Sequence, residues 1–426
     1  MASADQVGYR LTTTAEASEL YAAGIHRTLA SIGGAHDAFQ DCLDADPTFA
    51  LGHAGLGFAL LGLGQTKDAF AAFDRADDCV QHATPRERSH VRAVTSLRTG
   101  GVKTVDIATE HLAEWPRDRL VAGVRSSALF FCGRLDKRER MVDAARSLRA
   151  ELPDDWYAHG LLAFALHEVD AFDECLDEAA AALAEEPRST QALHSIAHVY
   201  IETGRHVEGR AFADEREITY ERDGALYGHL AWHGALHDLA VGERGSAQRR
   251  FEQIICPEQN PQRGALWDAA SYLWRLDLDG ETTLTAPHWI KVAEAARSLS
   301  EFRSLPFLEL HAAMAYVATG AFEEARTLRN RWVGELHPAA TTLINTIDGF
   351  LAFAGHDYVS ARKLLPDAHE AVRLGGSNAQ RAVIEDTQLE ASVRAGCGHL
   401  GVATLQRRMG RSASRRDERR LERALG

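Results

Sequence analysis

The stretch from Ala50 to Asp78 decides the fold and reads ALGHAGLGFALLGLGQTKDAFAAFDRADD. Its first half carries small and apolar residues at helical spacing and stops at Gly64, a residue type that commonly ends helices. Its second half repeats this spacing through Ala69 and Phe73. Residues four apart share one helix face. The stretch therefore predicts two antiparallel helices that pack closely through small side chains.

Similar helix pairs are predicted along most of the chain. The clearer copies span residues 156–187, 190–214, 228–251, 266–280 and 306–329, and weaker copies span 86–116, 118–153, 341–365 and 378–409. Alternating β-branched runs, which would predict strands, are nearly absent. One such pair cannot bury its own apolar face, so neighbouring pairs must stack. We predict one all-α helical-repeat domain over residues 1–426, with an N-terminal helical pair at 14–47, repeats at 48–405 and a solvated basic helix or tail at 406–426.

Composition narrows the class of protein. The 426 residues are 45% hydrophobic and 25% charged, which is ordinary for a globular protein, and their formal net charge is −14. This charge argues against nucleic acid and anionic membranes as partners. The chain has no long apolar run and no signal-like N-terminus, and its six cysteines lack the Cys-x-x-Cys spacing. These features predict a cytoplasmic protein with reduced cysteines.

The helix pairs resemble tetratricopeptide repeats. A wider set of motifs resembles the tetratricopeptide repeat protein 38-like family. These motifs are Asp46-Pro47 with 49–53, 84–91, 197–209, 229–236, 268–276 and 375–381. The resemblance implies a right-handed superhelix whose first helices line a concave surface, and it leaves the biochemistry open. It also implies that residues 156–280 line this groove. The predicted ligand-binding residues there are Tyr157, His167, Glu202, Trp232, Trp267, Trp274 and Arg275, although the tryptophans also suit packing and Arg275 an ion pair.

Two columns of histidine stand out in mid-chain. His194, His198 and Glu202 are four residues apart and must share one helix face, and His229 and His233 repeat this spacing on the next predicted first helix. If the two helices are neighbours, the columns face each other. The simplest interpretation of any one of these histidines is a half-buried packing residue.

Two classes of function fit the columns. A metal ion can take two imidazoles from one helix face, so His194, His198 and Glu202 are candidate ligands for a divalent transition metal. Without a cofactor, His194, His198, His229 and His233 could act as catalytic acids and bases, since imidazole titrates near neutrality. We predict a binding protein for a small molecule or peptide, most simply without a cofactor and with a homodimer allowed. The alternative is an enzyme of small-molecule metabolism, including secondary metabolism, that uses the histidines as a metal site or as general acid and base.

Overall fold

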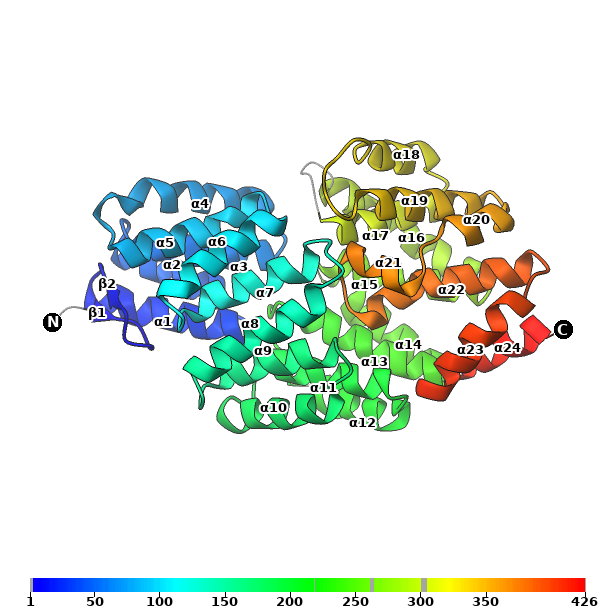
Figure 1. Cartoon of the computed structure of the whole chain (residues 1–426), viewed down its shortest axis with the longest axis horizontal. Helices are drawn as coiled ribbons and strands as arrows, with labels where there is room; N and C mark the ends of the chain where they lie inside the picture. The colour runs from blue at the N-terminus through cyan, green and yellow to red at the C-terminus, as the bar shows by residue number, and fades with distance from the viewer. Residues whose placement is uncertain (1–2, 218, 261–263, 300–304, 426) are drawn as a thin grey trace. The chain divides into compact units, whose positions relative to one another are not determined.

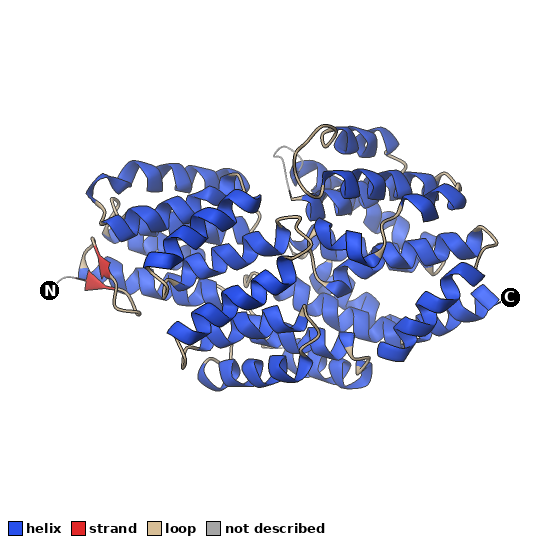
Figure 2. Ribbon diagram, in the orientation of Figure 1, coloured by secondary structure: helices blue, strands red, loops and turns tan. Residues whose placement is uncertain are grey.

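The computed structural model of the chain describes residues 3–217, 219–260, 264–299 and 305–425. The described residues form twenty-four α-helices and one two-stranded antiparallel hairpin, β1 (Ser3–Ala4) and β2 (Arg10–Leu11), seen as the red arrows of Figure 2. The all-α, helical-repeat prediction is therefore confirmed. The hairpin was not predicted. Its turn forms because Gly8 takes a positive φ of 86° and the Asp5 carboxylate accepts hydrogen bonds from the backbone of Val7 and Tyr9.

The described residues group into two compact units. The first unit consists of residues 1–132, 136–196 and 220–227, and the second of residues 133–135, 197–219 and 228–426. The boundary passes through α11 (Thr190–Glu202), between Ile196 and Ala197.

In the first unit, helices adjacent in sequence pack as hairpins and each hairpin packs on the next (Figure 1). Its elements after the strands are α1 (Ala15–Ala30), α2 (Ala35–Ala45), α3 (Ala50–Gly62), α4 (Thr66–Cys79), the 3-10 turn Val80–His82, α5 (Pro85–Thr95), the 3-10 turn Ser96–Arg98, α6 (Gly101–Glu114), α7 (Arg119–Phe131), α8 (Lys137–Glu151), α9 (Trp156–His167), α10 (Phe172–Glu185) and the first half of α11.

The small residues predicted to allow close packing do so at α3. A Cβ atom added to Gly55 would lie 2.4 Å from the ring of Phe39, and one added to Gly57 would lie 2.5 Å from the ring of Phe73. Larger residues would therefore push α3 away from α2 and α4. Helix starts are also specified locally: Thr84 and Glu87 form a complete capping box at α5.

The second unit repeats the packing of sequential helices around α15, α17 and α22. Its elements after the second half of α11 are α12 (His206–Glu217), α13 (Tyr227–Val241), α14 (Arg244–Arg250), the π-helical turn Phe251–Ile255, α15 (Gly264–Leu278), α16 (Thr282–Leu299), α17 (Pro306–Ala318), α18 (Phe322–Asn330), α19 (Ala340–Ala354), α20 (Tyr358–Leu364), α21 (Ala368–Ala371), the 3-10 turn Val372–Leu374, α22 (Asn378–Arg394), α23 (His399–Arg411) and α24 (Arg415–Leu425).

The basic C-terminal segment is packed, whereas a solvated helix or tail was expected. Arg416 and Arg420 on α24 are buried, at 8% and 3% exposure. Arg420 Nη1 lies 2.7 Å and Arg408 Nη1 2.8 Å from Asp386 Oδ1 on α22. Although burial raises it, the charges of Arg420 and Arg408 hold the pKa of Asp386 well below its ordinary value. The arginines are buried because they form ion pairs with this buried carboxylate, which the local sequence does not predict.

Candidate functional site

Three histidines from two helices of the second unit converge. His198 comes from α11, and His229 and His233 lie one turn apart on α13. The ring centroids of His198 and His233 are 4.4 Å apart and those of His229 and His233 are 4.7 Å apart, both edge to face. Each residue offers a ring nitrogen within 4.8 Å of the nitrogens of the other two. The structure thus brings together three of the four histidines predicted as catalytic.

A carboxylate on α15 orients one of these rings. Asp268 Oδ1 lies 2.8 Å from His229 Nδ1, and Asp268 is only 1% exposed. Burial raises the pKa of Asp268, and the charge of His229 opposes that rise. A carboxylate acceptor at Nδ1 favours the tautomer in which Nδ1 carries the proton, so the lone pair of Nε2 is available. Asp268 was not among the predicted site residues.

Trp232 covers one face of the oriented ring. Its indole stacks on His229 with centroids 5.2 Å apart and an interplanar angle of 15°, and its side chain is fully buried. Its Nε1 has no hydrogen-bond partner among the described residues. The predicted ligand-binding residue Trp232 therefore does lie beside the histidines, as their apolar wall.

Arg275 stabilises the packing of the second unit. Its guanidinium lies 5.9 Å from the Trp232 ring centroid, but its Nη2 donates to the Ala379 carbonyl at 2.8 Å and its Nε lies 3.6 Å from Asp386. Burial lowers the pKa of Arg275 to about 9, despite the opposing charge of Asp386. These contacts favour the ion-pair interpretation of Arg275.

Glu202, predicted as a metal ligand, is engaged elsewhere in the second unit. Arg411 Nη2 lies 3.0 Å from Glu202 Oε2, and Glu202 belongs to neither of the two metal-capable groups found among the described residues. The carboxylate predicted to join His194 and His198 as a metal ligand is therefore paired with an arginine from α23. His194 keeps its expected place one turn before His198 on α11, in the half of the helix that belongs to the first unit.

The remaining predicted groove residues lie among other side chains. In the second unit, Trp274 donates from Nε1 to Thr387 Oγ1 at 2.8 Å and packs against Phe350, and Trp267 packs against Phe307. In the first unit, Tyr157 is 6% exposed, and the rings of His167 and His194 both contact Phe164. Aromatic packing accounts for these positions. The same residue types at the same spacing are also what a ligand-binding groove would require.

Comparison with known proteins finds distant similarity to solved structures. No family model matches the chain. Solved structures similar to it include the human IFIT1 dimer with m7Gppp-AAAA, at 12% identity and a TM-score of 0.45 with 96% of each chain covered. They also include an IFIT1 monomeric mutant with Gppp-AAAA, at 13% identity and a TM-score of 0.45, covering 97% of this chain and 95% of that one. The human IFIT1 dimer with PPP-AAAA follows at 14% identity and a TM-score of 0.41, covering 100% of this chain and 95% of that one.

The prediction that nucleic acid is not a partner is corrected by these structures. It rested on the net charge of −14, yet the solved structures of similar fold are complexes with capped or triphosphate AAAA oligonucleotides. Within the described residues, no helix is both long enough and apolar enough to cross a bilayer.

Proposed function

We propose that this chain is a helical-repeat binding protein that holds a divalent transition-metal ion through His198, His229 and His233. The observation that supports this most is the convergence of three ring nitrogens within 4.8 Å of one another, with Asp268 bonded behind His229. Imidazole nitrogen suits zinc, copper, nickel and iron, and a carboxylate behind a ligating histidine is a recurring arrangement at such sites.

The geometry needs a small adjustment to accept zinc. Bonds of about 2.0–2.1 Å in a tetrahedron hold ligand nitrogens about 3.3 Å apart. Rings up to 4.8 Å apart at their nitrogens must therefore rotate inward. Rotation of the side chains of His198 on α11 and of His229 and His233 on α13 is the adjustment that the site needs.

A three-histidine set leaves a coordination position for a ligand. In zinc proteins, three protein ligands plus an open position mark sites that bind water or substrate, whereas structural sites use four. We infer that the ligand is a small molecule or a peptide group with a donor atom for the metal.

The motif resemblance supports a relationship to the tetratricopeptide repeat protein 38-like family, and the reduced cysteines expected from the sequence support a cytoplasmic location.

A second candidate function is catalysis at the same place. His229 is oriented by Asp268 at 2.8 Å, the relation that prepares an imidazole to act as a general base. In this alternative the site needs no metal, and His198 or His233 would return the proton. The observation that favours it is the buried Asp268–His229 pair itself.

Metal binding is tested with chelator-treated protein that carries no histidine tag. Zinc titration against a chromophoric chelator is expected to show one equivalent bound. His229→Gln combined with His233→Gln should abolish binding, whereas His399→Gln, at an exposed position of α23, should not change it. Less than about a tenth of an equivalent of any transition metal, with no thermal shift on adding metal, would refute the metal site and leave the catalytic candidate.

A further inference from the structure

We propose that the cavity beneath the N-terminal hairpin of the first unit is part of a binding site for aromatic carboxylates, and that Asp5, which lines the cavity, and Tyr9, whose ring lies over Arg86, act as its internal ligand. The cavity has a volume of about 30 Å³. Residues 5–7 of the hairpin form one side, and Tyr21 of α1, Arg86 of α5 and Arg119 of α7 contribute to the other. This site is independent of the histidines in the second unit.

Arg86 is the centre of the site. It is 8% exposed, and its Nη2 lies 3.1 Å from Asp5 Oδ2 and 2.5 Å from Asp118 Oδ2. Its Nε and Nη1 are buried without a hydrogen-bond partner among the described residues. A guanidinium carries five N–H donors in a planar fork that matches a carboxylate in two-point fashion. Arg86 therefore has donors that the present occupant does not use.

The two carboxylates on Arg86 have different roles. Asp118 is 2% exposed and also lies 2.8 Å from His90 Nδ1 and 3.1 Å from His111 Nε2. Although burial raises it, the charges of His90 and Arg86 keep the pKa of Asp118 well below its ordinary value. Asp118 is thus a fixed part of the helical scaffold. Asp5 comes from the hairpin, so it is the carboxylate that another molecule could replace.

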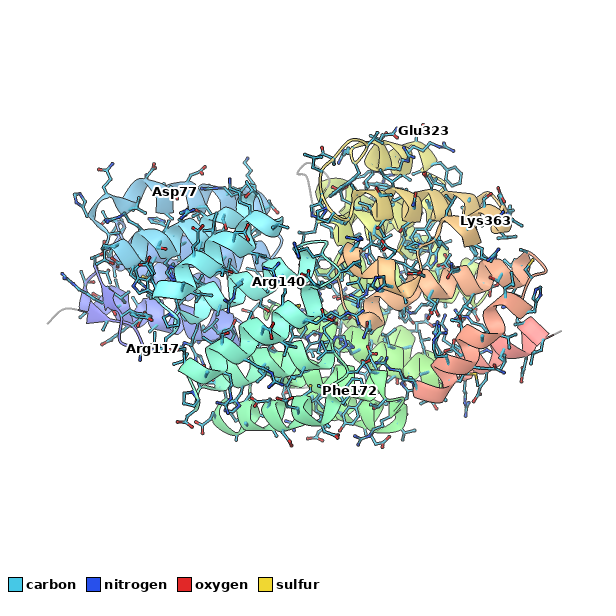
Figure 3. The ribbon with its side chains drawn as sticks, in the orientation of Figure 1. Asp77, Arg117, Arg140, Phe172, Glu323 and Lys363 are labelled. Carbon is cyan, nitrogen blue, oxygen red and sulfur yellow. The ribbon has the colours of Figure 1, made fainter. Side chains whose placement is uncertain are left out.

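An aromatic ring accompanies Asp5 onto the same arginine. The Tyr9 ring centroid lies 4.9 Å from Arg86 Cζ and 5.5 Å from Arg117 Cζ, the labelled surface arginine of Figure 3. The positive charge of an arginine is attracted to the face of an aromatic ring. The hairpin therefore presents a carboxylate and a ring together, and this pair of groups defines the chemical class of the ligand.

The hairpin is short, and an external ligand can displace it. Its strands are two residues long, and two-stranded hairpins are marginally stable by themselves. Beyond Arg86, its polar contacts include Gln6 Oε1 with Arg119 Nη2 and the Thr12 amide, which donates to Glu87 Oε1 at 2.8 Å. An external aromatic carboxylate can make the Arg86 contacts once Asp5 and Tyr9 withdraw, and the cavity then enlarges by the volume of their side chains.

The test uses the full chain with Asp5→Ala and Tyr9→Ala combined, and 3-(4-hydroxyphenyl)propionate as the probe in isothermal titration calorimetry. The double variant should bind the probe saturably and at least tenfold more tightly than the unchanged protein, because the internal competitor is gone. The uncharged 3-(4-hydroxyphenyl)propionamide should bind at least tenfold more weakly than the acid. Equal affinity in the two proteins, or no saturable binding by the double variant, would overturn the proposal.

Arginine variants in the double-variant background complete the test. Arg86→Lys should weaken the probe at least tenfold, because a lysine cannot reproduce the guanidinium fork. Arg92→Lys, at an exposed arginine of the same helix, should leave affinity unchanged. If circular dichroism shows that Arg86→Lys is unfolded, Arg119→Gln replaces it with the same expected loss. Full affinity in a folded Arg86→Lys or Arg119→Gln protein would refute the assignment.

Discussion

Replacing Asp268 by asparagine is the sharpest test of how the histidines of the second unit are prepared. The amide oxygen of asparagine can still accept a hydrogen bond from His229 Nδ1, now 2.8 Å from the carboxylate, so the ring should keep its orientation and tautomer. What disappears is the negative charge behind the ring. The substitution therefore isolates the electrostatic part of the support that Asp268 gives.

The expected loss follows from this geometry. Changing a group that orients a metal-bound histidine typically weakens metal binding by about 10–100-fold, or about 1.4–2.8 kcal/mol. Because Asp268 is 1% exposed, solvent screens its charge little, and the upper half of that range is expected. The loss should appear in the zinc dissociation constant and not in the stoichiometry, since the three imidazoles remain.

The assay is competition between the protein and a chromophoric chelator at fixed pH. Asp277→Asn is the matched control, because Asp277 lies nine residues along the same helix, about 13 Å away, and receives a hydrogen bond from Trp289 Nε1 at 2.7 Å. It removes the same charge from α15 without contacting His229. A zinc dissociation constant within twofold of the unchanged protein in Asp268→Asn, or an equal loss in Asp277→Asn, would refute the role of Asp268.

Three further predictions concern stability. Burial and the nearby charge of a second histidine lower the pKa of His237 to about 3. Below the ordinary histidine pKa, protons therefore bind the unfolded chain preferentially, so the contribution of His237 to stability is complete above pH 6.5 and should fall by about 1.4 kcal/mol per pH unit toward pH 3. Urea unfolding of His237→Asn should lack this pH-dependent component, and a pH profile equal to that of the unchanged protein would contradict the reasoning. Asp118→Asn should destabilise the protein by about 3–5 kcal/mol in denaturant unfolding, because it leaves a buried guanidinium without its fixed counter-charge; a loss below about 1 kcal/mol would show that solvent compensates. Gly55→Ala should cost about 1–3 kcal/mol, because the new methyl group would lie 2.4 Å from the ring of Phe39. Gly245→Ala, whose Cβ meets nothing within 4 Å, should instead raise the melting temperature through helix propensity worth about 0.5–1 kcal/mol; the same sign for both substitutions would argue against close packing as the reason for glycine at α3.

The fold could be predicted because its determinants are local. Small residues such as Gly55 and Gly57 recur at helical spacing and meet aromatic rings of the neighbouring helices, so periodicity alone reports both the helices and their close packing. The N-terminal hairpin was missed because strands of two residues leave too short an alternation to detect.

The site could be predicted only in part, since some of its contacts join residues that lie far apart in the sequence. Spacing places His229 and His233 one turn apart on any helix, and stacking of consecutive first helices brings His198 to them. Spacing also places Glu202 below His198, but Arg411, 209 residues later, takes that carboxylate. Asp268 was missed because an aspartate on a largely apolar helix carries no local signal, and its role depends on the ring of His229 that it faces.

The passage of the unit boundary through α11 limits how the gene could be divided. A fragment ending at Ile196 would break the helix between His194 and His198, and it would lack residues 220–227, which pack with the first unit. A break after residue 227 would keep residues 220–227 with the first unit, but the same fragment would then carry residues 197–219, which belong to the second unit. When the chain is cut for a split reporter or for domain shuffling, the cut should therefore lie in a turn between helices of a single unit. The turn at Gly320 is one such position outside the helices.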